Sequence, residues 1–283
     1  MRLGRRQAAP KRVVLIPNQW NGSVQQYYHF LLGYLAPIAT WVEAHPGTPI
    51  AVRDCGPMNR WFELLSDQAD VEIMTVGDVL HILAGNLQPY EVLRGKDFPE
   101  EFHQSSLRRF ADWTRQQALT DQPTRSGSLP NIVVSDRASH DEFFSGPGAE
   151  WPESGSLKRS VPNLATAVQS WNDPDVAIID AAELDISTQI EMHSSARILI
   201  GQHGAGLTNM IWMPPGAHVI EILPPMPDDA TPIFRNLAVN LGLQHHVVPQ
   251  GGVHEPVDAG LLEGLYVRAR TEVMDQGRDS FSS

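Results

Sequence analysis

Cysteine and lysine are scarce in this chain of 283 residues. Cys55 is the only cysteine, so neither an intrachain disulfide nor a zinc site built on several cysteines can form. Such low cysteine usage is typical of proteins in a reducing compartment. Only three of the 21 basic residues are lysines, and the arginines that make up the rest suit bidentate binding of anions.

Long apolar runs are also lacking. The basic start, residues 1–11, is followed by Val13–Ile16, which is too short for the apolar core of a signal peptide. No run approaches the ~18 apolar residues that a membrane span needs. The composition, 42% hydrophobic and 19% charged, excludes a disordered chain. We therefore expect a soluble, cytoplasmic protein without a membrane span.

Positive charge is in deficit. The chain has 33 acidic and 21 basic residues, a net charge of −12. A surface of this sign repels the phosphate backbone, which argues against nucleic-acid partners. A small anion can still bind where arginine, histidine and backbone N–H groups gather. The positions of the arginines therefore matter more than the total charge.

Short apolar runs alternate with helical patterns along the chain. The runs predict strands at Val13–Ile16, Pro49–Val52, Val71–Thr75, Ile132–Val134, Val176–Ile179, Arg197–Ile200, Val219–Leu223 and His246–Val248. Helical spacing covers Phe30–Val42, Trp61–Leu65, Val79–Leu83, Phe102–Trp113, Leu164–Trp171, Ser187–His193, Leu207–Met213 and Ile233–Leu241. Pro37 should kink or interrupt the first helix. The alternation predicts two α/β units with mainly parallel sheets.

The best linker lies at Thr120–Pro130, where prolines, glycine and hydroxyl residues cluster. It divides the chain into an N-terminal unit, residues 1–125, and a C-terminal unit, residues 126–255. Residues 256–283 are expected to form a C-terminal helix that packs back on the N-terminal unit. A ligand is expected in the cleft between two such units.

A glycine-rich turn is the strongest feature of the sequence. Gly201-Gln202-His203-Gly204-Ala205-Gly206-Leu207-Thr208-Asn209 follows an apolar strand and precedes a helical pattern. Strand, glycine-rich turn and helix are how open α/β sheets present N–H groups to an anion. Gly204 and Gly206 allow close approach of the backbone and positive φ. His203 can hydrogen-bond a phosphate, although glycines that serve only a tight turn would show the same pattern.

This stretch carries a resemblance to a known family. Residues 203–209, followed by Met213-Pro214-Pro215-Gly216 and Val219-Ile220-Glu221-Ile222, resemble the signature of glycosyltransferase family 61. The segment Tyr28-His29-Phe30-Leu31-Leu32 is similar to the family's aromatic-His-aromatic helix start. Arg159 followed by Asn163 resembles its mid-chain Arg and Asn. The resemblance is strong over residues 155–245 and loose before them.

The resemblance implies a fold, a reaction and a set of substrates. It implies a GT-B-like fold of two Rossmann-like domains facing across a cleft, residues 1–125 on the acceptor side and 126–255 binding the donor. It implies transfer of a sugar from a nucleoside-diphosphate sugar to an acceptor hydroxyl, with inversion and without a metal or other cofactor. The donor site would consist of Arg159, Asn163 and the signature residues His203, Gly204, Ala205, Gly206, Leu207, Thr208 and Asn209.

Two further residues are candidates for donor binding. Arg137 follows a predicted strand, so its guanidinium should lie at the strand's carboxyl end, where it can clamp a diphosphate and stabilise the leaving group. A surface arginine paired with Asp136, Asp141 or Glu142 is the alternative. Glu221 interrupts an apolar strand and needs a partner if buried. The resemblance implies that Glu221 accepts the donor's ribose hydroxyls, and a strand-end carboxylate facing water is the alternative.

Inverting transfer needs a general base for the acceptor hydroxyl. His29 is the first candidate, because histidine titrates near neutrality and this one matches the family's aromatic-His segment. A half-buried histidine of the core is the alternative. Asp54, just after a predicted strand, is the reserve candidate.

Several other patterns do not support a site. Asp173-Pro174-Asp175 has the form of a metal-binding acidic pair, but it directly precedes a strand, which favours a turn. His245 and His246 are neighbours on a predicted strand and point to opposite faces. No Gly-x-Ser-x-Gly nucleophile motif is present. The alternatives to glycosyl transfer are a nucleotide-sugar epimerase or hydrolase on the same scaffold, and a non-catalytic carbohydrate-binding protein.

Overall fold

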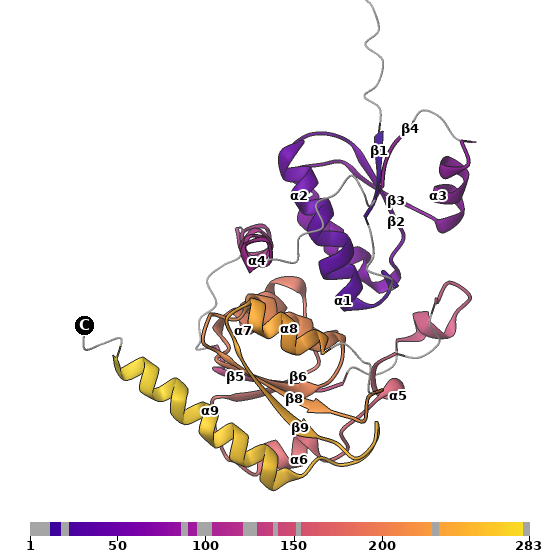
Figure 1. Cartoon of the computed structure of the whole chain (residues 1–283). Coiled ribbons are helices and arrows are strands. Elements are labelled where there is room, and N and C mark those ends of the chain that lie inside the picture. Colours follow the sequence, from indigo (N-terminus) through magenta and orange to yellow (C-terminus); the bar gives the residue numbers. More distant parts are fainter. Residues whose placement is uncertain are drawn as a thin grey trace, which may run out of the picture. The chain divides into compact units, whose positions relative to one another are not determined.

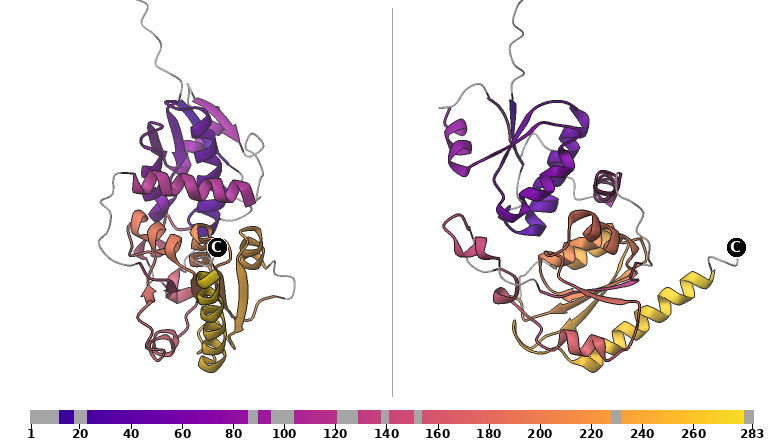
Figure 2. Two further views of the ribbon diagram at one scale, coloured as in Figure 1. Left: turned by 90° about the vertical axis from the view of Figure 1, so that its left-hand side faces the viewer. Right: turned by 180° about the vertical axis from the view of Figure 1, so that it is seen from behind.

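A computed structural model describes most of the chain. The described residues are 12–17, 23–85, 90–94, 104–120, 129–137, 141–150, 154–227 and 232–279. The basic start, residues 1–11, and most of the predicted linker, residues 121–128, lie outside them. The chain forms two compact units, Met1–Glu101 and Phe102–Ser283, and each is an α/β structure around a parallel sheet (Figures 1 and 2).

The first unit is built on a four-stranded parallel sheet with the order β3-β2-β1-β4. Its strands are β1 (Arg12–Ile16), β2 (Ile50–Arg53), β3 (Val71–Met74) and β4 (Tyr90–Arg94). Its helical segments are α1 (Tyr27–Phe30), η1 (Leu31–Leu35), α2 (Ala36–Ala44), the 3₁₀ helix η2 (Gly56–Leu65) and α3 (Val76–Leu83). The sequence did not predict β4, because this half-exposed edge strand has no continuous apolar run.

The first helix is not broken at Pro37, although its geometry changes just before it. The chain stays helical from α1 through η1 to α2, and η1 is a π-helical segment. Proline lacks the N–H that an α-helix needs, and a π turn is one way to accommodate a locally altered hydrogen-bond pattern. The predicted interruption is therefore a change of helix type within one continuous segment.

Buried aromatic side chains fix this helix within the first unit. Phe30 packs edge-on against Phe62 of η2, with ring centroids 5.6 Å apart, and Tyr27 contacts Trp61 at the same centroid distance. The Tyr34 hydroxyl accepts a hydrogen bond from the Arg53 N–H at 2.8 Å. These contacts tie the helix to the segment that follows β2.

The second unit contains a five-stranded parallel sheet with the order β6-β5-β7-β8-β9. Its strands are β5 (Ile132–Ser135), β6 (Val176–Ile179), β7 (Ile198–Gln202), β8 (His218–Leu223) and β9 (Gln244–Pro249). Counted within this unit, the order is 2-1-3-4-5, so the direction of winding reverses between β5 and β7. Open sheets of this kind bind ligands at the carboxyl ends of the strands at such a switch point.

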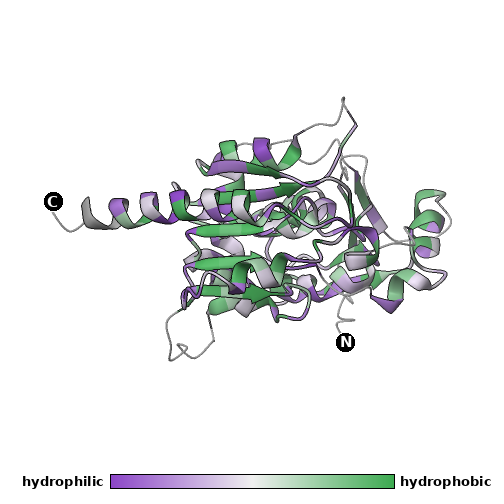
Figure 3. Cartoon of the chain, turned by 90° about the horizontal axis from the view of Figure 1, so that it is seen from below, coloured by the Kyte–Doolittle hydropathy of each residue, from purple (hydrophilic) through white to green (hydrophobic). Residues whose placement is uncertain are grey.

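Helices cover both faces of the second sheet (Figure 1). The helical segments of this unit are α4 (Gln104–Leu119), α5 (Gly155–Lys158), α6 (Leu164–Gln169), α7 (Ile186–Ser195), α8 (Ile233–Asn240), α9 (Ala259–Asp279) and the 3₁₀ helices η4 (Glu142–Ser145) and η5 (Ala205–Trp212). Alternate apolar residues of the strands pack against α6 and α9 on one face. Figure 3 shows these hydrophobic strands in green beside the mixed surface of α9.

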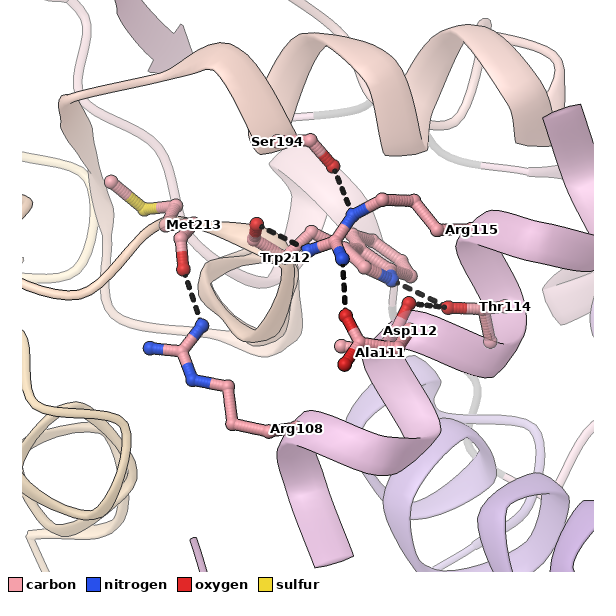
Figure 4. A network of polar contacts seen from close by, with 8 residues as sticks. All are labelled: Arg108, Ala111, Asp112, Thr114, Arg115, Ser194, Trp212 and Met213. Atoms are coloured by element: carbon pink, nitrogen blue, oxygen red, sulfur yellow. Dashed lines mark hydrogen bonds and ion pairs between the residues drawn. The ribbon is translucent and has the colours of Figure 1, made fainter. Parts of the chain in front are cut away.

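Helix α4 belongs to the second unit, so the division lies between residues 101 and 102 rather than between 125 and 126 as expected. Arg108 donates to the carbonyl of Met213, which follows η5, at 2.5 Å (Figure 4). It also donates to the carbonyl of Leu241, which follows α8. Arg115 donates to the Trp212 carbonyl at 3.1 Å. Cationic donors stabilise the unpaired carbonyls at helix C-termini, and this attraction places α4 on the second unit.

The C-terminal helix packs on the second unit, and its expected return to the N-terminal unit stays a prediction. Tyr266 of α9 stacks on Trp171 with ring centroids 4.0 Å apart. Arg270 forms ion pairs with Asp173 at 2.7 Å and Asp175 at 2.9 Å. Asp173 also accepts a hydrogen bond from the Asp175 N–H, which confirms the predicted turn. Among the described helices, none has the length and apolar character of a membrane span.

Candidate functional site

The carboxyl ends of β5 and β7 bring the two main sequence candidates together. Ser135, the last residue of β5, pairs in register with Gly201 of β7. Two residues beyond each of these positions lie Arg137 and His203. The parallel register therefore places Arg137 beside the glycine-rich turn at the switch point of the sheet, as the sequence predicts.

Two guanidinium groups converge on one backbone atom of this turn. Arg137 donates through Nη2, and Arg159 through Nη1 at 2.9 Å, to the carbonyl oxygen of His203. Neither arginine forms an ion pair with a carboxylate among the described residues, so the surface pairing considered for Arg137 is not what the structure shows. Burial, followed by the charge of Arg159, lowers the pKa of Arg137 to about 10. The two guanidinium groups therefore gather positive charge at this turn in an acidic protein, and the charge of Glu221 also acts on Arg159.

Gly204 is required by the position of Arg137. A Cβ atom at Gly204 would lie 2.2 Å from Arg137 Nη2, and the residue has a φ of 156°. At Gly206 a Cβ would lie 3.2 Å from the Ser135 hydroxyl oxygen, so the turn packs tightly against the end of β5. Gly206 does not have the positive φ that the sequence suggested. Both glycines permit close approach, and only Gly204 combines it with positive φ.

Gln202 organises the turn, although the sequence reasoning did not single it out. Its Oε1 accepts from Arg137 Nε at 3.1 Å, and its Nε2 donates to Gln250 Oε1 at 2.7 Å and to the Ser160 carbonyl at 3.0 Å. The side chain therefore links Arg137 with the residue that follows Arg159. Its position inside the signature was the only signal in the sequence. The partners of an uncharged amide cannot be predicted from sequence, because here they lie far away along the chain.

A buried carboxylate joins two histidines next to the turn. Glu221 of β8 accepts from His203 Nδ1 at 2.5 Å through Oε1, and from His245 Nε2 at 2.8 Å through Oε2. The Glu221 side chain is 5% exposed and that of His203 is 10% exposed. Burial raises the pKa of Glu221, but the hydrogen bonds and charges of the two histidines outweigh it and leave the pKa lowered. Glu221 is therefore not the water-facing carboxylate of the alternative interpretation, and its proposed contact with ribose stays a prediction.

The rest of the signature is buried. Leu207, Thr208 and Asn209 lie in η5 and are almost wholly inaccessible, and Asn209 accepts a hydrogen bond from Gln189 at 2.8 Å. Asn163 uses both ends of its amide on the backbone of Val257, with donor–acceptor distances of 2.9 Å. The Asn163 and Asn209 side chains are thus bonded within the unit, and Leu207 and Thr208 are buried. The centre formed by Arg137, Arg159 and His203–Gly206 is therefore the part of the signature region best suited to contact a ligand. Direct contact of the other four side chains with the donor stays a prediction.

The two candidate bases both lie in the first unit. His29 is in α1, half-buried, with its ring edge-to-face to Tyr28 at a centroid distance of 5.2 Å. Asp54 follows β2, and its Oδ1 accepts from the Gly56 N–H at 2.9 Å and from Asn59 Nδ2 at 2.7 Å. Asp54 therefore stabilises the start of η2. Within the described residues, no cluster of three or more His, Cys, Asp or Glu side chains is arranged to hold a metal ion.

Comparison with known proteins agrees with these features. The family model described as Glycosyltransferase 61 matches residues 27–220, a range that contains His29, Arg137, Arg159 and the signature turn. A curated relative, protein O-linked-mannose beta-1,4-N-acetylglucosaminyltransferase 2 of Takifugu rubripes, is 33% identical over 82 residues. That alignment covers 28% of this chain and 14% of the relative. Because the family match covers more than half of the chain, this protein belongs to glycosyltransferase family 61.

Proposed function

We propose that this protein transfers a sugar from a nucleoside-diphosphate sugar to a hydroxyl group of an acceptor, with inversion and without an essential metal. Family membership supports glycosyl transfer in general. Inversion and metal independence rest on the resemblance of the signature residues to the family. The proposed donor site is the centre formed by Arg137, Arg159 and His203–Gly206.

The convergence of two arginines on the His203 carbonyl is the observation that carries this proposal. A diphosphate carries negative charge that planar guanidinium groups bind bidentately, and the backbone N–H groups of a glycine-rich turn add neutral donors. When the sugar leaves, negative charge grows on the diphosphate. Fixed cations in a partly buried site stabilise this charge and lower the barrier.

We also propose the GT-B arrangement, in which one Rossmann-like unit binds the donor and the other contributes to the acceptor side. Two wholly parallel sheets with separate sets of helices support it. Under this arrangement the base that takes the acceptor proton comes from the first unit, with His29 ahead of Asp54. A Michaelis-complex structure with donor and acceptor would place the base directly.

Calorimetry with ADP, CDP, GDP and UDP, each with and without EDTA, tests the donor site. Wild type should bind at least one nucleoside diphosphate, with the same affinity in EDTA. Arg137→Met and Arg159→Met should each weaken binding by about 10- to 100-fold, the loss expected for a hydrogen bond to a charged group. Arg197→Met is the control, because Arg197 is exposed and precedes β7 at the opposite end of that strand.

Three outcomes would contradict parts of the proposal. Unchanged affinity in both arginine variants would exclude this centre as the donor site. Binding that disappears with EDTA would exclude the metal-free mechanism. Rapid turnover of a nucleotide sugar in the absence of any acceptor would favour the hydrolase or epimerase alternative over transfer.

A further inference from the structure

We propose that Glu221 and His245 are positioning residues that hold His203 as a charged hydrogen-bond donor to the diphosphate of the donor. This inference rests on the proposed function, because it needs a diphosphate at the turn. It assigns a role to His245, which the sequence reasoning set aside. It also gives Glu221 a role that acts through another side chain rather than through direct contact with ribose.

The strand register determines why these three residues meet. Gly201 of β7 pairs with Glu221 of β8, and His203 follows two residues after Gly201. On β9, His245 pairs with Val219, two residues before Glu221. Residues two apart on a strand share a face, so His245 and Glu221 lie on the same face of the sheet. The following residue, His246, lies on the other face and contacts His218 at 3.1 Å.

The His203 ring is held on two sides. Its Nδ1 donates to Glu221 Oε1 at 2.5 Å. The imidazole ring also packs against Phe234 of α8 in a T-shaped contact, with ring centroids 5.1 Å apart and an interplanar angle of 74°. Its Nε2 has no partner among the described residues. A ring restrained in this way presents one nitrogen to a ligand in a fixed direction.

The carboxylate determines which form of the ring is favoured. A carboxylate bonded to Nδ1–H stabilises the doubly protonated ring, in which Nε2–H is a charged donor. Among the described residues, the charged or titratable side chains placed against the His203 segment are Glu221, His245, Arg137 and Arg159. Glu221 is the only anion among these four, so its charge offsets the repulsion that His203 would otherwise experience from the two arginines.

His245 stabilises the carboxylate rather than the ligand. It donates to Oε2, the oxygen that His203 does not use, at 2.8 Å. A buried carboxylate oxygen without a donor is costly, and rotation of the carboxylate would weaken its bond to His203. With both oxygens bonded, Glu221 keeps one orientation. A continuous series of hydrogen bonds therefore runs from His245 on β9 through Glu221 on β8 to His203 in the turn.

The first experiment measures binding of inorganic pyrophosphate at pH 7 in EDTA, together with the ¹⁵N NMR signals of the histidine rings. The His203 signals are assigned by their loss in His203→Asn. In wild type with pyrophosphate bound, both ring nitrogens of His203 should carry protons. Glu221→Gln should leave one ring nitrogen unprotonated and weaken pyrophosphate by about 10- to 100-fold. A merely structural role would not change the protonation of the ring.

The second experiment uses matched variants of β9. His245→Gln keeps an N–H donor for Glu221 and should retain affinity for pyrophosphate within about threefold of wild type. His245→Leu removes the donor and should lose about tenfold, the scale of one hydrogen bond to a charged group. His246→Gln is the control on the opposite face of the strand, and it should leave both affinity and the His203 ring signals unchanged.

The outcomes separate this inference from the proposed function. If wild type binds neither pyrophosphate nor any nucleoside diphosphate, the donor site itself is wrong and this inference falls with it. If wild type binds but its His203 ring is singly protonated in the complex, the inference alone is overturned. If Glu221→Gln weakens nucleoside diphosphates and not pyrophosphate, the inference is likewise overturned and Glu221 contacts the ribose instead.

Discussion

The two units present their candidate residues in different ways. In the second unit, Arg137, Gln202 and Glu221 each make at least two hydrogen bonds at the end of the sheet. Arg137 bonds Gln202 and the His203 carbonyl, Gln202 also bonds Gln250, and Glu221 bonds His203 and His245. In the first unit, Asp54 serves mainly to begin a 3₁₀ helix, and His29 lies half-buried at the start of a helix. If the proposed donor site is correct, its geometry is therefore built into the folded second unit.

Replacement of His29 tests this comparison with the largest expected effect. Proton removal by a positioned base contributes ~10²–10⁴ in rate, so His29→Ala should lower turnover by about that factor. Its affinity for nucleoside diphosphates should stay near that of wild type, because the proposed donor site lies in the other unit. Steady-state kinetics and calorimetry on the same preparation measure the two effects.

His45→Ala is the control for this replacement. His45 is an exposed histidine of the first unit that stacks on Trp41 with ring centroids 4.2 Å apart. It should lose neither turnover nor affinity. Normal turnover in His29→Ala would exclude His29 as the base and favour Asp54. Loss of nucleotide affinity in this variant would contradict the proposed separation of roles between the units.

The acid sensitivity of the two units should also differ. Burial lowers the pKa of His193 in α7 to about 4, partly opposed by its hydrogen bond to the Gln189 carbonyl at 2.7 Å. An unfolded histidine titrates near pH 6.5, so between pH 6.5 and 4 the unfolded chain binds more protons than the folded one. The free energy of unfolding should therefore decrease as pH falls through this window, by at most about 3 kcal/mol from this group.

Hydrogen exchange of peptides from each unit, corrected for the intrinsic dependence on pH, measures this effect. Protection of α7 should fall between pH 6.5 and 4.5, and His193→Gln should reduce the dependence. Burial lowers the pKa of His218 as well, which gives the same sign, so part of the dependence should persist in the variant. An equal loss of protection in α1 and α2 would show that the acid sensitivity is not specific to the second unit.

The smallest expected effect concerns the turn itself. Gly204→Ala should displace the Arg137 guanidinium, because the new Cβ would lie 2.2 Å from Nη2. We expect about a tenfold loss of pyrophosphate affinity, similar to the loss of one hydrogen bond to a charged group. Gly264→Ala in α9 is the matched control, since a Cβ there meets nothing within 4 Å. It should leave binding unchanged and stabilise the helix by up to about 1 kcal/mol. Unaltered binding in both variants would exclude a role for the close approach of Arg137.

Short apolar runs located most strands, because strands buried in a parallel sheet are hydrophobic on both faces. The half-exposed edge strand β4 escaped this reasoning, and so did the short helix α5. The placement of α4 was also missed. Its amphipathic pattern predicts a helix, but only the folded structure brings Arg108 to the ends of η5 and α8.

The sequence by itself determined the alternation of strands and helices, the glycine-rich turn after β7, and the arginine at the end of β5. These features are local, since each depends on a few adjacent residues and on the direction of a strand. Tertiary structure alone decided that Arg137 and Arg159 meet at the His203 carbonyl and that His245 joins Glu221. Those contacts depend on strand order and register, which bring together residues far apart in the chain. A shift of β9 by one residue would, for example, turn the His245 side chain away from the face of the sheet that carries Glu221.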